Sequence, residues 1–195
     1  MRYAYYKNKI SDFISESPES ILGTLSGFNA FDLELTQRDA WQREITLLKE
    51  ALDVPEFASG TILFEYTIPR LCGRIDVVLL LNGVVFVVEF KVGEKNYPKD
   101  AVKQVLEYCL DLKYFHQASE NLELVPVLIC TKAENPASMD YSAYFETIYK
   151  PITCSSSNKL REVLTCFSAA KQRSEIDAEN WLTSPYSPTP TIVEA

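Results

Sequence analysis

Two runs of apolar, mostly β-branched residues between positions 74 and 91 flank the dipeptide Asn82-Gly83. This pattern predicts a β-hairpin, because both residues tolerate the positive φ angles of a type I′ turn. If the turn contains two residues, Leu81 pairs with Val84, which sets the register of both strands. Strands that are apolar on both faces belong in the middle of a sheet that is covered on both sides.

Charged residues interrupt the apolar pattern at the far end of this hairpin. Counting outward from the turn places Asp76 opposite Glu89 and Arg74 opposite Lys91. Because side chains alternate between the two faces of a strand, Asp76, Glu89 and Lys91 are expected to share one face. By the same alternation, that face also carries Val78, Leu80, Val85 and Val87, and the other face carries Ile75, Val77, Leu79, Phe86, Val88 and Phe90.

These facing carboxylates create a conflict, because like charges destabilise a cross-strand pair and a buried charge without a partner is costly. A divalent cation between Asp76 and Glu89, with Lys91 close by, would resolve it. A salt-bridged quartet of Arg74, Asp76, Glu89 and Lys91 would resolve it equally well without a ligand, since ion-pair networks also perturb pKa values. On the hairpin alone, the metal site and the quartet have equal standing.

A helix is predicted from Thr36 to about Leu52, opened by the capping-box pattern Thr36-Gln-Arg-Asp39. Glu44 lies near the centre of its apolar stripe. A glutamate in a core-facing stripe is costly unless it is paired, either at a functional site or with an arginine or a tyrosine hydroxyl. We expect Glu44 to point toward Asp76 and Glu89. The apolar stripe consists of Ala40, Trp41, Leu47, Leu48, Ala51 and Leu52.

The rest of the chain alternates between strand and helix patterns. Pro98 fits the first position of a helix that runs to about His116, on which Gln104 and Tyr108 are one turn apart and share a face. A strand that follows this helix should run parallel to the strand before it. The other predicted elements are helices over 18–25 and 158–171 and strands over 62–68, 124–131 and 145–152. This order predicts an α/β fold with a mixed central sheet and helices on both faces.

The chain divides into one domain over residues 1–182 and a terminal segment over 183–195. Within the domain, residues 1–35 are expected to pack against the sheet. The terminal segment contains three prolines and has the composition of a linker toward a further domain that this chain does not contain.

Composition narrows the functional classes. Apolar residues make up 47% of the sequence, but no apolar run reaches the roughly 18 residues of a membrane span, and the N-terminus lacks the apolar core of a signal peptide. The five cysteines show no zinc-ligand spacing, which favours reduced thiols and a cytoplasmic protein. The net charge of −8 is unusual for a nucleic-acid binder, although Lys91, Lys95, Lys99 and Lys103 concentrate positive charge after the hairpin.

An Asp on one strand followed by Glu-x-Lys on its hairpin partner resembles the active-site pattern of PD-(D/E)XK nucleases. The segment Gln104-Val-Leu-Glu-Tyr108 resembles the Gln-x-x-x-Tyr motif of their RecB-type branch. Residues 64 to 131 more closely resemble a nuclease-like domain found at the N-terminus of certain bacterial helicase-like proteins, which continue into a P-loop motor related to the Schlafen group. The shared sequence motifs are IPR-x-x-x-RIDVVLL, VEFKVGE, Gln-Val-x-x-Tyr and Val-Pro-Val-Leu.

This resemblance implies a restriction-endonuclease-like core and a Mg²⁺- or Mn²⁺-dependent nuclease that acts on DNA more readily than on RNA. The implied metal ligands are Asp76, Glu89 and the Phe90 carbonyl, with Glu44 completing the cluster or holding a second ion. Lys91 would orient the attacking water or screen the scissile phosphate, and Gln104 and Tyr108 would contact phosphate or orient the carboxylates.

The alternative function is a catalytically inactive module of the same fold that binds nucleic acid or a protein partner. The acidic net charge favours this alternative, and the complete Asp, Glu and Lys set favours the nuclease.

Overall fold

The structure is a computed structural model that describes residues 3–27, 35–69, 73–169 and 173–187 of the 195-residue chain. The strands are β1 (Tyr6–Lys9), β2 (Thr61–Ile68), β3 (Gly73–Leu81), β4 (Val84–Lys91), β5 (Glu123–Cys130), β6 (Ala143–Phe145), β7 (Ile148–Tyr149) and β8 (Ile152–Cys154). The helices are α1 (Ile10–Ser15), α2 (Pro18–Ser26), α3 (Leu35–Leu52), α4 (Lys99–Phe115), α5 (Ser157–Ala169) and α6 (Ala178–Thr183), with 3₁₀ turns η1 (Pro55–Phe57) and η2 (Gln117–Ser119). No helix in the described ranges is long and apolar enough to cross a membrane.

The strands form one mixed sheet in the order β1-β2-β3-β4-β5-β7-β6, and β8 also pairs with β5. Strands β1, β2, β3 and β4 pair with one another in antiparallel orientation. As predicted from the intervening helix, β5 runs parallel to β4. Strands β7 and β8 also run parallel to β5, so the carboxyl ends of β4, β5 and β8 meet at one edge of the sheet.

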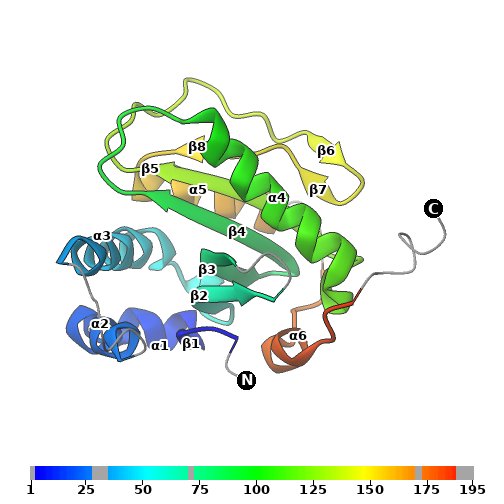
Figure 1. The fold of residues 1–195 in the computed structure, drawn as a ribbon, viewed down its shortest axis with the longest axis horizontal. Helices are drawn as coiled ribbons and strands as arrows, with labels where there is room; N and C mark the ends of the chain where they lie inside the picture. Colours follow the sequence, from blue (N-terminus) through cyan, green and yellow to red (C-terminus); the bar gives the residue numbers. More distant parts are fainter. Residues whose placement is uncertain (1–2, 28–34, 70–72, 170–172, 188–195) are drawn as a thin grey trace.

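Helices cover both faces of this sheet, as Figure 1 shows. One apolar core joins one face of the sheet to α1, α2, α3 and α5. A second core joins the opposite face to α4 and α6. The α/β class, the mixed sheet and the helices on both faces are therefore confirmed.

The central hairpin has the predicted two-residue turn. Asn82 and Gly83 both have positive φ angles, 49° and 75°. Leu81 pairs with Val84, and the antiparallel ladder continues without a shift to Val77 and Val88.

Three local features differ from the prediction. Residues 6–9 form an edge strand that was not predicted, since their mostly polar sequence shows no clear alternation. The strand pairs with β2 through backbone groups, which the side-chain pattern does not reveal. The strand predicted over 145–152 is divided into β6, β7 and β8. Pro98 is the residue before α4 rather than its first residue, with the extended ψ of 135°.

The packed part of the chain extends past the predicted boundary at residue 182. The Gln117 N–H donates to the Pro185 carbonyl at 3.1 Å, and the Ser187 N–H donates to the Phe115 carbonyl at 2.7 Å. These bonds attach residues 184–187 to the end of α4 and the turn that follows it, and the second gives the Phe115 carbonyl, at the end of the helix, the donor that it needs. The rest of the predicted linker, residues 188–195, lies outside the described residues.

Candidate active site

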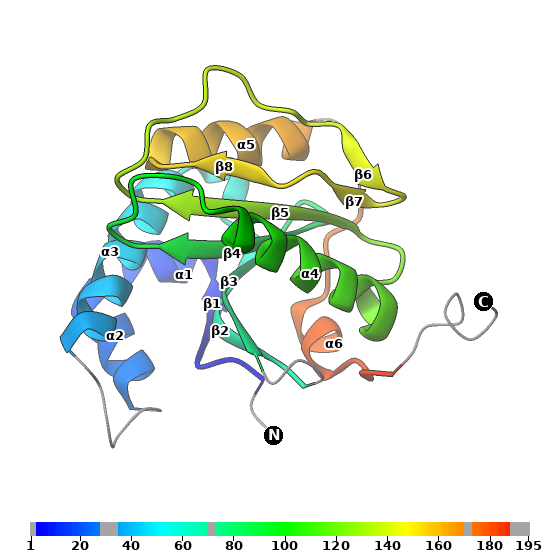
Figure 2. The same ribbon diagram turned by 45° about the horizontal axis from the view of Figure 1, so that its top comes forward.

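The predicted site lies at the end of the β3–β4 hairpin that is farthest from its turn. Figure 2 shows the arrowheads of β4 and β5 pointing toward this end, where α3 lies. Ligand sites in α/β sheets usually form at the carboxyl ends of parallel strands. Here β2 and β3 add residues from antiparallel strands to such an edge.

Glu65 interrupts the regular pattern of β2. Its φ angle is 54°, an uncommon value for a residue other than glycine, and its side chain is buried. The pairs Phe64–Val77 and Tyr66–Ile75 on either side place Glu65 opposite Asp76 on β3. One Glu65 oxygen accepts a hydrogen bond from Trp41 Nε1 at 2.8 Å.

The alternation of side chains inverts at this pair of residues. On β2, Phe64 belongs to the core beside α3, and Tyr66 belongs to the core beside α4. On β3, Ile75 packs with the α4 core, although alternation predicts that it shares the α3 side with Val77. The prediction for Ile75 was wrong, because the alternation inverts at the pair Glu65 and Asp76, where Glu65 has a left-handed backbone.

Asp76 lies where the ladder between β3 and β4 ends. Its Oδ2 accepts a hydrogen bond from the Phe90 backbone N–H at 2.8 Å, so the carboxylate takes the place of a backbone acceptor. Burial raises the pKa of Asp76 well above its ordinary value, and the nearby charge of Glu89 raises it further.

Glu89 and Lys91 form a close pair on β4. Lys91 Nζ lies 2.8 Å from Glu89 Oε1. Burial raises the pKa of the Glu89 carboxyl, although the hydrogen bond from Lys91 opposes this effect. Burial alone would lower the pKa of Lys91, but the bond to Glu89 and the attraction of both carboxylates give a net increase, which keeps the lysine charged.

Gln104 and Tyr108 extend this polar chain onto α4. Lys91 Nζ lies 3.4 Å from Gln104 Oε1, and Gln104 Nε2 donates to the Tyr108 hydroxyl at 2.7 Å. Their shared helix face was predicted, and the structure places it beside Lys91. The three side chains thereby connect the Glu89 carboxylate to α4.

Glu44 reaches the cluster from α3, on the other side of the sheet. Its side chain is 5% exposed. Burial raises its pKa well above the ordinary value, and the charges of Asp76, Glu65 and Glu89 add to the increase. This placement agrees with the expectation that Glu44 points toward Asp76 and Glu89.

Arg74 does not complete the predicted quartet. It is the cross-strand partner of Thr67 on β2, and its Nε lies 3.2 Å from Glu65 Oε2. The described ladder between β3 and β4 ends before it could place Arg74 opposite Lys91. The cluster therefore has two separate ion pairs, Arg74–Glu65 and Lys91–Glu89, rather than one network. The structure adds Glu65 to the cluster, a residue whose place there strand alternation does not indicate.

The donor set fits a hard divalent cation, although the side chains do not form a finished cage. Across residues 3–27, 35–69, 73–169 and 173–187, no three His, Cys, Asp or Glu side chains are grouped so that they could hold a metal ion. Carboxylates repel one another until a cation joins them, so they do not gather at coordination distance on their own. Glu89 Oε2 is buried and receives no N–H or hydroxyl hydrogen bond from the described residues, and the Glu89 carboxyl lies close enough to that of Asp76 to share a proton with it. A buried carboxylate oxygen of this kind is suited to a cation.

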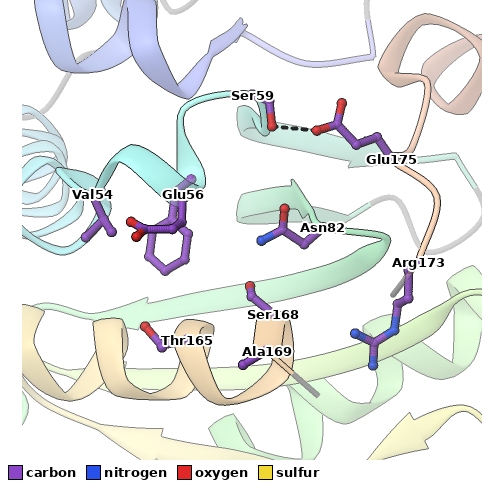
Figure 3. Close-up of a pocket in the computed structure, with 10 residues that line it drawn as sticks. Val54, Glu56, Ser59, Asn82, Thr165, Ser168, Ala169, Arg173 and Glu175 are labelled. Carbon is purple, nitrogen blue, oxygen red and sulfur yellow. Dashed lines mark hydrogen bonds between the residues drawn. The ribbon is translucent and has the colours of Figure 1, made fainter. Parts of the chain in front are cut away.

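A cavity of about 720 Å³ lies at the opposite end of the hairpin, beside Asn82. Figure 3 shows its lining from η1, the hairpin turn, α5 and the segment that carries Arg173. The Arg173 guanidinium bonds to Glu123 Oε2 at 2.7 Å and to the Phe167 carbonyl at 2.8 Å. This cavity contains none of the predicted site residues, so its size does not make it the centre of the chemistry.

In comparisons with known proteins, no family model, curated protein or solved structure matches this chain significantly. The geometry around Asp76 and Glu89 therefore carries the functional conclusion.

Proposed function

We propose that this protein hydrolyses phosphodiester bonds of DNA with the help of Mg²⁺ or Mn²⁺. The observation that carries the proposal is the buried Glu89 carboxylate, which lies within hydrogen-bond reach of the Asp76 carboxyl and pairs with Lys91. Carboxylates with raised pKa values, clustered around an ammonium group, are typical of sites that bind metal and phosphate. The resemblance to PD-(D/E)XK nucleases supports the same reaction.

Asp76, Glu89 and the carbonyl of Phe90 would hold the cation, and Glu44 would complete the cluster. All of these ligands offer oxygen atoms, which Mg²⁺ and Mn²⁺ prefer. When bound, such a cation lowers the pKa of a coordinated water and stabilises negative charge on the phosphate. Glu65 remains bonded to Trp41 and Arg74, so it contributes charge to the cluster rather than a ligand atom.

Lys91 places a positive charge beside the carboxylates, where it could contact the phosphate of the substrate. Its raised pKa keeps the ammonium protonated at neutral pH, so it can donate hydrogen bonds to a water or to a phosphate oxygen. Gln104 limits the positions that the ammonium can adopt, and Tyr108 holds the Gln104 amide in turn. This chain of contacts fixes Lys91 before a substrate arrives.

The resemblance also supports a setting for the reaction. The domain would act in the cytoplasm on DNA, with RNA as the less favoured substrate, and would be linked to a helicase-type ATPase in a longer chain. DNA processing or defence against foreign DNA fits such an arrangement.

The second candidate is a module of the same fold that binds nucleic acid or a partner without turnover. The net charge of −8 favours the form of this candidate that binds a protein partner, because phosphate neutralisation drives nucleic-acid affinity and an acidic protein supplies little of it.

A Mn²⁺ titration by calorimetry, paired with a cleavage assay on single- and double-stranded DNA, tests the proposal. We expect the wild type to bind Mn²⁺ and to cut at least one substrate, and Asp76→Ala to do neither. DNA binding without cutting under any metal would replace the nuclease with the non-catalytic module.

A further inference from the structure

Arg74 lies at the edge of the carboxylate cluster and pairs with Glu65. It occurs two residues before Asp76 on β3, and Glu65 lies opposite Asp76 on β2. The guanidinium is therefore a close cationic neighbour of the proposed reaction centre, on the side of α3. Lys91 contacts α4 instead, so the two cations flank the carboxylates from opposite faces of the sheet.

Contacts on two sides hold Arg74 in place. Its Nε pairs with Glu65, its Nη1 donates to the Tyr5 hydroxyl, and its guanidinium lies 4.9 Å from the centre of the Tyr5 ring. Despite these contacts, 40% of the side chain is exposed. Arginine has further N–H donors in a planar fork that matches the oxygens of a phosphate. A guanidinium that is already ordered loses little entropy when it binds an anion.

Glu65, the acidic partner of Arg74, occupies an energetically unfavourable position. Glu65 has a left-handed backbone and adds a buried negative charge beside three other carboxylates. A residue outside the favoured regions of φ and ψ costs on the order of 1 kcal/mol or more, and such residues concentrate at functional sites. Pairing Arg74 with an exposed acid elsewhere on β2 would avoid both costs, so the arrangement favours a role at the site.

We infer that Arg74 binds a backbone phosphate of the nucleic acid next to the phosphate at the carboxylate cluster, with Glu65 as its positioning residue. This inference rests on the proposed function, because it takes the cluster to be the reaction centre. An acidic cluster on a protein of charge −8 repels a polyanion, so the substrate needs an ordered cation on each side of the cluster.

A pair of variants separates phosphate binding from simple neutralisation of Glu65. Glu65→Gln keeps an acceptor for Trp41 but removes the charge that Arg74 would otherwise neutralise. In the Glu65→Gln background the ion pair between Arg74 and Glu65 is already lost, so adding Arg74→Gln removes the positive charge without breaking an ion pair. Lys150→Gln is the matched control, because Lys150 is an exposed lysine paired with Asp140 near β7.

The measurement is the affinity for a fluorescein-labelled oligodeoxynucleotide in EDTA, by anisotropy, over a series of KCl concentrations. We expect Glu65→Gln/Arg74→Gln to bind several-fold more weakly than Glu65→Gln, with a slope of log K against log[KCl] that is smaller by about one. Lys150→Gln should keep the wild-type slope. The affinity loss should also be similar for oligonucleotides of different sequence, as a phosphate contact requires.

Equal affinity and equal slope for the single and double variants would overturn the inference. If the wild type also cleaves DNA with Mn²⁺, the proposed function survives that result and only the role of Arg74 is lost. If the wild type neither binds nor cleaves DNA, the proposed function fails and the role of Arg74 fails with it.

Discussion

Asp76 accepts a hydrogen bond through Oδ2 from the backbone N–H of Phe90, at 2.8 Å. This bond joins β3 to β4 where their ladder has ended, so the fold needs an acceptor at position 76. The fold does not need the charge, because burial and Glu89 both raise the pKa of the Asp76 carboxyl. The Asp76 oxygen that accepts the hydrogen bond therefore has a structural role, whereas the negative charge of the carboxylate is available to bind a cation.

Asp76→Asn should therefore stabilise the protein in the absence of metal. The asparagine carbonyl can accept the bond from Phe90, and the repulsion from Glu89 and Glu44 is removed. Because the pKa of Asp76 is raised in the folded state, its contribution to stability is complete below the unfolded pKa and is lost as the pH rises. The gain of the variant over the wild type should thus increase from about pH 4 toward neutral pH.

Thermal unfolding in EDTA at pH 7 checks this prediction. We expect the midpoint to rise by at least about 2 °C, the shift that 1 kcal/mol produces in a chain of this size. Calorimetry on the same variant should detect no Mn²⁺ binding. A lower midpoint than that of the wild type would show that the carboxylate charge is part of the fold.

His116 provides a pH-dependent contribution of the opposite sign, far from the site. Its ring is buried, with Nδ1 2.7 Å from Ser119 Oγ and Nε2 2.8 Å from the Trp181 carbonyl. Burial lowers its pKa to about 4. Between this value and the unfolded pKa of about 6.5, the unfolded chain binds more protons, so this residue destabilises the fold as the pH decreases, by up to about 3 kcal/mol.

Proton NMR can test this prediction directly, because His116 is the only histidine in the sequence. Its ring resonances should titrate with a midpoint near 4, as far as the protein stays folded. A midpoint near 6.5 would mean that the ring reaches solvent and that the contacts to Ser119 and Trp181 do not persist.

Gly83 and Gly93 form a natural pair for separating backbone strain from a steric clash. Both have positive φ angles, 75° and 84°. A Cβ at Gly83 would collide with Arg173 and lie 2.8 Å from the Ser174 carbonyl oxygen, whereas nothing lies within 4 Å of one at Gly93. Gly93→Ala should cost about 1–2 kcal/mol, the strain alone. Gly83→Ala should cost clearly more in urea unfolding, and equal losses would rule out the close approach of Arg173.

The hairpin and its charged end could be predicted from sequence, because the signals were local. Asn82-Gly83 defines the turn, and counting from it gave the correct ladder from Leu81 to Val77. Helical periodicity likewise placed Glu44 on a buried face and Gln104 next to Tyr108. Each of these predictions needs only one element, or two elements joined by a tight turn.

Features that depend on contacts between distant segments could not be predicted in this way. The inversion at Glu65 arises from its left-handed backbone and from bonds to Trp41 and Arg74, which come from two other elements. Strict alternation therefore placed Ile75 on the wrong face. The attachment of residues 184–187 to α4 depends on backbone groups, which leave no mark on the side-chain pattern.

Lys91 and Glu89 form an ion pair with each other, yet replacing each by alanine should have different effects on Mn²⁺ binding and on DNA cleavage. Glu89→Ala removes an oxygen ligand from a hard cation, so Mn²⁺ binding and DNA cleavage should both be lost. Lys91→Ala removes positive charge beside the carboxylates, so Mn²⁺ affinity should stay the same or increase while cleavage falls by at least about 100-fold.

The comparison requires pH 8, because the loss of Lys91 removes the group that opposes the rise in the pKa of Glu89. At lower pH, protonation of Glu89 would compete with Mn²⁺ and imitate a lost ligand. Calorimetry gives the Mn²⁺ affinity, and single-turnover cleavage gives the rate without product release. Parallel loss of both quantities in Lys91→Ala would assign the lysine to holding the carboxylates rather than to the reaction. Full cleavage by Lys91→Ala would remove the lysine from the proposed mechanism and leave the reaction to the carboxylates and their cation.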